Sequence, residues 1–414
     1  MTARTGRLPL ATLLVHCLLM ALMVAPGAVA AMAPSAEGTS AVATERSRAA
    51  GFYDLPDGEQ VLVIFAANSP LRVYQLGADY RSDAIERSQD GGLRWLRSTE
   101  GDALDIVFDA GPPASAPGFT ATGSAIVLRA ERSENPAYSL AEVSYANGPV
   151  TLSGSVLLPA GARAAPGAVL VHGSGDSDRD NGWYLTIADS LARRGIAVLL
   201  PDKRGCGRSG GEWRQSSFDD FAADALAAAT ALAAMPGVAP DQVGLVGISQ
   251  GGGWVVPAAL DEGRALPYAV NLVGAATTPR EQLRHETLQT LRQKGYPEWT
   301  LGIVQPVASA IPRWRRSEWW SLNGDFDPLP AWRSATMPVL VVFGRDDEHD
   351  NVPVTASLAL LEPVVAAQPA GRFRIEVFEG SGHGLYAPGT RNIREDFLTL
   401  LGDWIIEATG GETS

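Results

Sequence analysis

The pattern of apolar and polar positions changes character along the chain, and its clearest part begins near residue 137. From there, short continuous apolar runs alternate with longer stretches in which apolar residues recur at helical spacing. Continuous short runs are typical of strands buried on both faces, and the longer stretches are typical of amphipathic helices. The apolar runs span residues 168–171, 196–200, 243–246, 269–273, 339–343 and 375–378, with helical stretches at 187–194, 218–235 and 394–407. This alternation predicts a largely parallel sheet with helices on both faces.

A hairpin precedes these runs. Residues 140–145 and 151–158 are strand-like and flank Asn147-Gly148, a dipeptide that favours a tight turn between antiparallel strands. We therefore expect one α/β domain over residues 137–414. In such a domain, reactive groups belong on the loops at the carboxyl ends of the strands.

Residues 51–136 have a different pattern. Short apolar runs are separated by Asp-Gly, Gly-Gly and Pro-Pro turn signals, and they span residues 61–65, 71–76, 104–108 and 125–128. Such spacing predicts a small all-β domain of meandering strands. No histidine lies between residues 17 and 171, and no catalytic constellation is evident. We expect this domain to pack on the one that follows, or to bind part of an extended substrate.

The first 31 residues have the pattern of a secretory signal peptide. Arg4 and Arg7 precede an apolar run over residues 8–24, which ends near the small residues Ala28-Val29-Ala30. A membrane anchor is the alternative, but His16 and Pro26 interrupt the apolar pattern. We expect a secreted or periplasmic protein without a stable membrane anchor after cleavage, and a disordered linker over residues 32–50, which lack periodicity.

One insertion interrupts the alternation of strands and helices. Residues 277–336 lie between two predicted strands and are too long for a simple crossover. They hold half of the ten tryptophans: Trp299, Trp314, Trp319, Trp320 and Trp332. An insertion at this edge predicts a cap over the site. Its aromatic rings would either contact an apolar part of a substrate or hold the helices of the cap together.

Composition and charge exclude several classes of function. The formal net charge is −13 and becomes two units more negative once Arg4 and Arg7 are removed, so nucleic acid is an unsuitable partner. Cleavage leaves Cys206 as the one cysteine, which excludes an internal disulfide. The remaining histidines are His172, His285, His349 and His383, and no two have the spacing of metal ligands on a helix. We expect neither a metal nor another cofactor.

Ser249 is the candidate nucleophile. It lies in Gly247-Ile248-Ser249-Gln250-Gly251, between a predicted buried strand and a predicted helix. A strand that turns sharply into a helix holds the serine in a strained conformation, and glycines on either side let strand and helix pass closely. The motif alone is common in a glycine-rich chain, so the other groups must be found independently.

A serine nucleophile needs a base, and the base needs an orienting acid. His383 follows the last predicted strand in a glycine-rich loop and is the candidate base. The acid should follow the run at 339–343, where Asp347 is our first choice because it comes three residues after Gly344. Asp350 is the alternative acid, and Asp346 is third. His349 lies on the acid's own loop, which makes it an unsuitable base.

An oxyanion hole needs two backbone N–H groups. One would come from Gln250, directly after the nucleophile, and the other from the loop that follows an early strand. The stretch His172-Gly173-Ser174-Gly175 supplies that loop, and we place the second donor at Ser174. His172 itself is better interpreted as a structural residue that holds the loop.

Residues 137–410 resemble the α/β-hydrolase superfamily. The similarity rests on the stretch 172–180, on Asp202-Lys203-Arg204-Gly205-Cys206-Gly207-Arg208-Ser209 and on the Ser249 motif, which resemble a bacterial esterase branch related to the prolyl-oligopeptidase type. The resemblance implies an α/β-hydrolase fold and carboxylic ester hydrolysis through an acyl-enzyme without a cofactor. The acid loop is longer than the usual pattern, so the resemblance does not decide whether Asp347 or Asp350 is the acid. Cys206 occupies a variable position and is interpreted as a buried thiol.

The sequence therefore predicts an exported serine hydrolase that acts on a small ester. A peptidase is the alternative, with Arg313, Arg315 and Arg316 of the cap as candidates for binding a peptide carboxylate, although they could equally form a solvated basic face. A thioesterase is a further alternative, and a binding protein that keeps the fold without turnover is the hypothesis from another class. The sequence does not determine substrate specificity or the oligomeric state.

Overall fold

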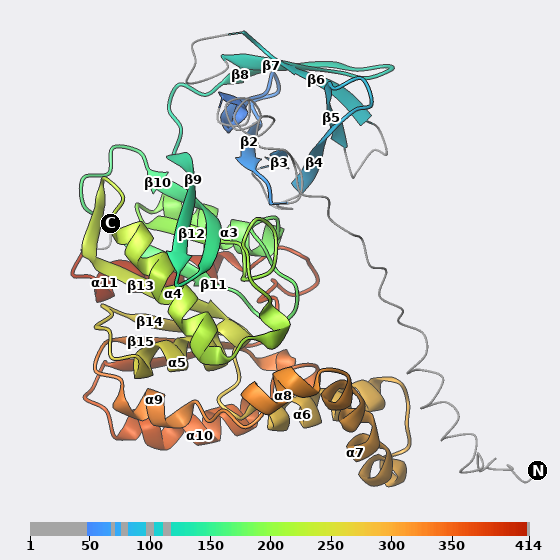
Figure 1. Cartoon of the computed structure of the whole chain (residues 1–414), viewed down its shortest axis with the longest axis vertical. Helices are drawn as coiled ribbons and strands as arrows, with labels where there is room; N and C mark the ends of the chain where they lie inside the picture. The colour runs from blue at the N-terminus through green and yellow to red at the C-terminus, as the bar shows by residue number, and fades with distance from the viewer. Residues whose placement is uncertain (1–47, 68–70, 76–81, 97–102, 111–116, 412–414) are drawn as a thin grey trace, which may run out of the picture.

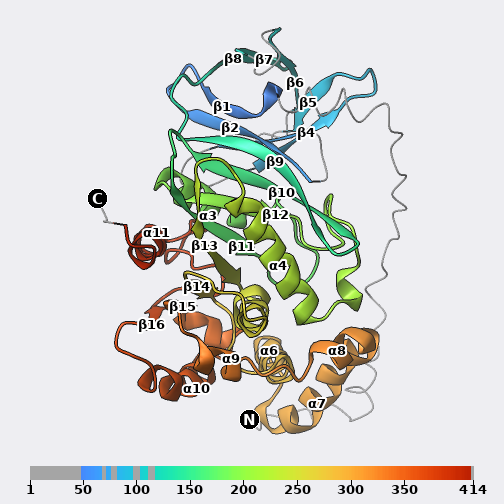
Figure 2. The same cartoon turned by 60° about the vertical axis from the view of Figure 1, so that its left-hand side comes forward.

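The computed structural model describes residues 48–67, 71–75, 82–96, 103–110 and 117–411. The predicted signal peptide and the predicted linker up to residue 47 lie outside the described residues. Figures 1 and 2 show a small β domain at one end, a central sheet with helices, and cap helices at the opposite end. Within the described ranges, no helix combines the length and the apolar character needed to cross a membrane.

The small domain is a closed barrel. Its strands follow chain order, each pairs with the next in antiparallel fashion, and the first pairs with the last through Tyr53 and Arg132. The strands are β1 (Gly51–Asp54), β2 (Gln60–Phe65), β3 (Leu71–Gln75), β4 (Ser82–Arg87), β5 (Leu93–Leu96), β6 (Ala103–Phe108), β7 (Gly118–Thr122) and β8 (Val127–Arg132). The sequence pattern revealed only some of them. Strands such as β5 alternate buried and exposed residues and therefore lack a continuous apolar run.

The larger domain contains the predicted mostly parallel sheet, which is confirmed. The strand order is β16-β15-β14-β13-β11-β12-β10-β9, in which the β9–β10 and β10–β12 pairs are antiparallel and the other neighbouring pairs are parallel. The strands are β9 (Tyr138–Asn147), β10 (Val150–Pro159), β11 (Ala165–Val171), β12 (Ala197–Pro201), β13 (Val238–Ile248), β14 (Ala269–Leu272), β15 (Val339–Gly344) and β16 (Phe373–Phe378). The hairpin β9-β10 turns at Gly148, whose φ is 55°.

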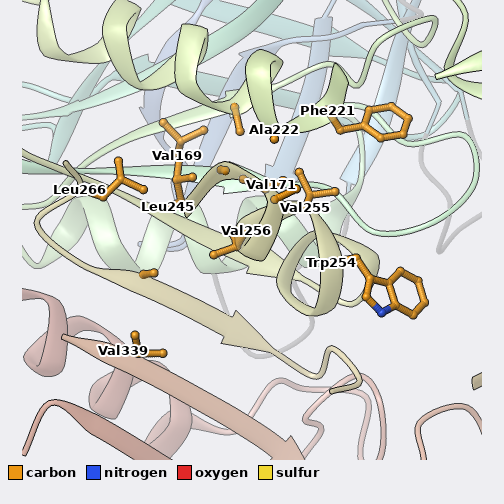
Figure 3. Close-up of a cluster of buried hydrophobic side chains, with 14 of the residues drawn as sticks. Val169, Val171, Phe221, Ala222, Leu245, Trp254, Val255, Val256, Leu266 and Val339 are labelled. Atoms are coloured by element: carbon orange, nitrogen blue, oxygen red, sulfur yellow. The ribbon is translucent and has the colours of Figure 1, made fainter. Parts of the chain in front are cut away.

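Helices cover both faces of this sheet. They are α3 (Gly182–Arg193), α4 (Phe218–Ala233), α5 (Val256–Asp261), α10 (Val354–Ala366) and α11 (Glu395–Ala408). Because successive strand residues point to opposite faces, Val169 joins the cluster under α4, α5 and α10, whereas Leu170 joins the cluster under α3 and α11. Figure 3 shows the first cluster, where Val169 and Leu245 of the strands gather with Phe221 and Val256 of the helices. Burial on both faces explains the continuous apolar runs.

The cap lies between β14 and β15, as the insertion at 277–336 predicted. It consists of α6 (Pro279–Gln293), α7 (Glu298–Arg315), α8 (Ser317–Asn323) and α9 (Leu329–Ser334). Its tryptophans have different environments. Trp332 belongs to the core of the sheet domain, Trp299 and Trp314 are exposed, and Trp319 and Trp320 line a cavity.

The barrel packs directly on the sheet domain. Phe52 of β1 meets Tyr138 of β9 edge to face, with 4.7 Å between the ring centroids. The backbone N–H of Ala67 donates to the Asp180 carboxylate at 2.7 Å, and Arg208 donates to the carbonyl of Ala66 at 3.2 Å. The barrel is therefore bonded to loops of the sheet domain.

Charged residues in two of the family-like motifs are structural. Arg179 is buried and donates to both carboxylate oxygens of Asp202, at 2.9 and 2.8 Å. Arg204 pairs with Asp224 at 2.7 Å. Because a buried charge is tolerated only when paired and hydrogen-bonded, these residues hold their loops together rather than bind a ligand.

Candidate active site

Ser249 lies at a sharp turn between strand and helix. β13 ends at Ile248, and Ser249 follows with a φ of 53°, a left-handed conformation that costs a non-glycine residue energy. A π-helical turn, η2 (Gly251–Val255), then leads into α5. The N–H of Ser249 donates to the carbonyl of Leu272 at 2.8 Å. The turn is thus anchored to the neighbouring strand.

The glycines of the motif are required by space. A Cβ on Gly251 would lie 2.2 Å from the carbonyl oxygen of Val171, and a Cβ on Gly247 would lie 2.5 Å from the carbonyl oxygen of Gly251. Both distances are far below van der Waals contact, and the obstructing atoms belong to the backbone. The strand and the helix can therefore approach this closely only without side chains at these positions.

Asp347 occupies the turn η3 (Arg345–His349), directly after β15. Its side chain is buried, and Oδ1 accepts from the backbone N–H groups of Asn351 and Val352, each at 3.3 Å. Oδ2 accepts from Nδ1 of His383 at 2.7 Å. Asp346, His349 and Asp350 are exposed. Of the three aspartates that the sequence left open, the structure brings Asp347 to the histidine.

His383 lies in the loop after β16, with Nδ1 on Asp347. Its other nitrogen, Nε2, lies 3.4 Å from Nδ2 of Asn351, whose carbonyl oxygen accepts from Gln282 of α6 at 3.1 Å. Among the hydrogen bonds of the described residues, none joins His383 to Ser249, although both side chains line one cavity. Sequence reasoning missed Asn351 and Gln282, because nothing in their local pattern distinguishes them from other surface amides.

The loop after β11 carries the second candidate oxyanion donor. The N–H of Gly173 already donates to the Tyr184 hydroxyl at 2.8 Å. Ser174 lines two cavities, one larger than the other, whose walls also contain Ser249. Gln250, the other candidate, is buried and also lines the larger cavity. The structure thus brings both residues to the nucleophile's surroundings.

His172 anchors the loop after β11 through both of its ring nitrogens. Its Nε2 bonds the carbonyl of Pro201 at 2.5 Å, and its Nδ1 bonds the hydroxyl of Ser177 at 2.9 Å. Burial lowers the pKa of His172 to about 4, so the ring is neutral at ordinary pH. Its position agrees with the structural role that we expected.

Lys203 is a buried residue that the sequence did not single out. Its Nζ donates to the carbonyls of Gly173 at 2.8 Å and Gly175 at 3.1 Å. The rings of Trp213 and Phe221 lie 5.0 Å from the same nitrogen, within the range of cation–π attraction. Burial lowers the pKa of Lys203 to about 8. The lysine therefore holds the two carbonyls on either side of Ser174.

Two cavities meet at Ser249. The smaller, of about 300 Å³, is lined by Gly173, Ser174, Asn181, Trp183, Tyr184, Ile248, Ser249, Val273, His383, Gly384 and Tyr386. The larger, of about 420 Å³, reaches under the cap and is lined by Ser174, Gly175, Trp213, Ser249, Gln250, Trp254, Pro279, Gln282, Leu283, Glu286, Ile311, Pro312, Arg315, Arg316, Trp319, Trp320 and Asn351. Neither lining contains a described residue of the barrel.

The charged residues of the larger cavity lie on the cap. Arg315 and Arg316 line it, whereas Arg313 instead donates to the backbone carbonyl of Ser309 at 3.1 Å. Glu286 is the carboxylate of the lining, and its pKa is raised first by burial and then by nearby Asp350. Cys206 is buried, and burial raises the pKa of its thiol, so the group is a poor nucleophile. Within the described ranges, no group of three or more His, Cys, Asp or Glu side chains has an arrangement suited to a metal ion.

The fold and this arrangement at the carboxyl ends of the strands define an α/β hydrolase. The model of the alpha/beta hydrolase family matches residues 168–390, which is more than half of the chain. The protein therefore belongs to the alpha/beta hydrolase family.

Individual relatives are distant. A non-heme haloperoxidase from Rhodococcus erythropolis is 24% identical over 260 residues, which cover 53% of this chain and 90% of that protein. Among solved structures, an esterase from Pyrococcus furiosus is 19% identical with a TM-score of 0.47, covering 66% of this chain and 92% of the other. A proline iminopeptidase from Mycobacterium smegmatis is 19% identical with a TM-score of 0.45, covering 65% and 99%.

Proposed function

We propose that this protein is a serine hydrolase that cleaves carboxylic esters through an acyl-enzyme intermediate. The observation that carries the proposal is the 2.7 Å hydrogen bond from His383 Nδ1 to the buried carboxylate of Asp347, with His383 and Ser249 on the wall of one cavity. An acid that orients an imidazole beside a hydroxyl on a strained turn is the arrangement that activates a serine.

In the first half of the reaction, Ser249 Oγ attacks the ester carbonyl and passes its proton to Nε2 of His383. Because Nδ1 donates to Asp347, the neutral ring presents Nε2 as an acceptor, and the carboxylate stabilises the imidazolium that forms. The backbone N–H groups of Gln250 and Ser174 stabilise the oxyanion. The intermediate then collapses, the alcohol takes the proton from Nε2, and the acyl group remains on Ser249.

In the second half, water attacks the acyl-enzyme and gives a proton to Nε2 of His383. The acid then leaves, and His383 returns the proton to Ser249 Oγ. Apart from the attacking water, the route uses side chains and backbone groups of the protein. It requires Nε2 of His383 to accept from Ser249, whereas Asn351 now lies against that nitrogen. Catalytic hydrogen bonds of this kind often tighten only when substrate is bound, and we expect the substrate to displace the Asn351 amide.

A fluorophosphonate probe tests the nucleophile. We expect covalent labelling of the wild type and none of Ser249→Ala, with both proteins showing the same thermal unfolding. A folded wild type that resists labelling would remove the basis of the proposal. A series of p-nitrophenyl esters of increasing acyl length then tests the reaction. Hydrolysis of these esters, abolished in Ser249→Ala, is the expected result.

A peptidase is the second candidate, because Arg315 and Arg316 line the cavity beside Ser249 and a guanidinium group suits a peptide carboxylate. Aminoacyl p-nitroanilides, run beside esters of matched acyl groups, separate the two activities. Faster cleavage of the anilides would favour the peptidase.

We also propose that the enzyme is exported, on the basis of Arg4, Arg7 and the apolar run at 8–24, followed by Ala28-Val29-Ala30. N-terminal sequencing of the protein from the exported fraction of an expressing bacterium tests this. A mature terminus near residue 31 is the expected result, whereas an intact chain that stays with the cytoplasm would contradict it.

A further inference from the structure

Two buried side-chain donors near the cavity under the cap have no partner within the described ranges. Gln250 and Trp319 are both buried, and among the described residues neither Nε2 of Gln250 nor Nε1 of Trp319 has a hydrogen-bond partner. Both residues line the cavity that contains Ser249. A buried donor without a partner costs free energy. Both nitrogens are covered by protein atoms, so a ligand acceptor can pair with them only if the lining side chains shift.

Arg316 adds a positive charge at this place. It lies at the break between α7 and α8, where its N–H donates to the carbonyl of Pro312 and its own carbonyl accepts from Trp320. These two bonds fix the backbone from which the side chain extends. The guanidinium carbon lies 5.5 Å from the centre of the Trp213 ring, which is another wall of the cavity.

This arginine differs from others in the cap. Arg280 and Arg292 are ion-paired with Asp325 and Glu298. Among the described residues, no carboxylate lies within 4.0 Å of Arg316. A cation held against an aromatic wall, without a protein carboxylate, can bind an anion of the ligand directly.

The positive charge at Arg316 is a local exception in an acidic protein. The chain has a formal net charge of −13, so its long-range field repels anions. The buried ammonium of Lys203 lies 5.0 Å from the centre of the same Trp213 ring. Glu286 is the one carboxylate of the cavity lining, and burial raises its pKa. The remaining walls combine the polar Ser174, Gln282 and Asn351 with an apolar group that includes Trp254, Leu283, Ile311 and Trp320.

We propose that the cavity under the cap binds an anionic group of the substrate through Arg316 and Arg315. Preferred substrates then have an apolar frame that joins a carboxylate, or a similar oxyanion, to the scissile bond. This inference rests on the proposed serine hydrolase, since it names the substrate class of that site. A free acid on an ester and the terminal carboxylate of a peptide share this chemistry.

A matched pair of esters tests the inference. The p-nitrophenyl monoester of adipic acid ends in a carboxylate, and p-nitrophenyl heptanoate has the same length and ends in a methyl group. We expect the wild type to hydrolyse the monoester with a kcat/KM about tenfold higher, the ratio that about 1.4 kcal/mol corresponds to. Equal values for the two esters would overturn the inference and leave the ester hydrolase intact. Hydrolysis of neither ester would instead reject the proposed function.

Variants locate the anion site. In Arg316→Gln the kcat/KM ratio of monoester to heptanoate should fall most of the way toward one, through a higher KM for the monoester. Arg313→Gln is the matched control, because Arg313 lies on the same helix end outside the lining. A preference that survives in the double variant Arg315→Gln/Arg316→Gln, or falls equally in Arg313→Gln, would contradict the assignment.

A third arm separates the two sources of the carboxylate. A dipeptide with a free carboxyl terminus is compared with its terminal amide. Cleavage of the free dipeptide at a higher kcat/KM than the monoester, lost in Arg316→Gln, would support the anion site with a peptide as ligand. An amide cleaved as well as the free acid would count against the anion site.

Discussion

The ammonium of Lys203 lies 2.8 Å from the carbonyl oxygen of Gly173 and 3.1 Å from that of Gly175, and so fixes the backbone on both sides of Ser174. Carbonyl orientation determines where the N–H of the next residue points, because the peptide unit is planar. Lys203 is therefore a positioning residue for the second oxyanion donor of the proposed mechanism.

Replacing this lysine should lower kcat without a matching change in KM. We expect Lys203→Met to reduce kcat for a p-nitrophenyl ester by about tenfold to a hundredfold, somewhat less than the loss of a direct oxyanion donor. Lys203→Arg, which keeps the charge and the donors, should recover part of it. Rates are normalised by active-site titration, so that unfolded protein is not counted. Lys294→Met, at an exposed position, is the control, and an unchanged kcat in Lys203→Met would exclude the positioning role.

Asp347 and Asp350 provide a matched pair on one loop. Asp347→Asn removes the carboxylate that accepts from His383, and we expect kcat to fall by about 10³ to 10⁴ because the ring loses its required tautomer. Asp350→Asn should change kcat less than twofold, since the side chain of Asp350 is exposed. Steady-state hydrolysis of a p-nitrophenyl ester measures both. The reverse ranking would identify Asp350 as the acid.

The stability of the fold should depend on the protonation of His172. Burial lowers its folded pKa to about 4, whereas an unfolded histidine has a pKa of about 6.5. Between these values the unfolded chain binds a proton that the folded protein does not, so acidification favours unfolding. The free energy of unfolding should fall by about 1.4 kcal/mol per pH unit over this interval. Above it, the group should make no pH-dependent contribution.

Urea unfolding at several pH values measures this slope. In His172→Asn the part of the slope that comes from this group should disappear, even if the variant is less stable at every pH. An identical slope in wild type and variant would show that other groups govern the acid sensitivity.

The glycine after the nucleophile should tolerate no side chain. A Cβ at Gly251 would lie 2.2 Å from the carbonyl oxygen of Val171, so Gly251→Ala must displace backbone of β11 or η2. We expect a loss of about 3 kcal/mol of stability together with loss of fluorophosphonate labelling. Gly302→Ala is the control, because Gly302 of α7 has no atom within 4 Å of such a Cβ and alanine favours a helix. A stable, labelled Gly251→Ala would disprove the packing argument.

The sequence by itself determined the sheet domain, the place of the cap and the turn at Ser249. Continuous apolar runs such as 243–246 are typical of strands that are buried between two layers of helices. The glycines around Ser249 indicate that the strand and the helix pass close to each other. These features are local, because each depends on the order of residues within a short stretch.

Only the tertiary structure decided which residues meet. Asp347 and Asp350 are chemically alike and three positions apart, and the choice between them depends on which one a turn buries against His383, far along the chain. Closure of the barrel and the gathering of Arg316, Trp213 and Trp319 around one cavity depend likewise on contacts between distant segments. A pattern along the chain records which face of an element is apolar, but it does not record which other element covers that face. The partners of Lys203 and Asn351 are therefore determined by the packing of the whole domain.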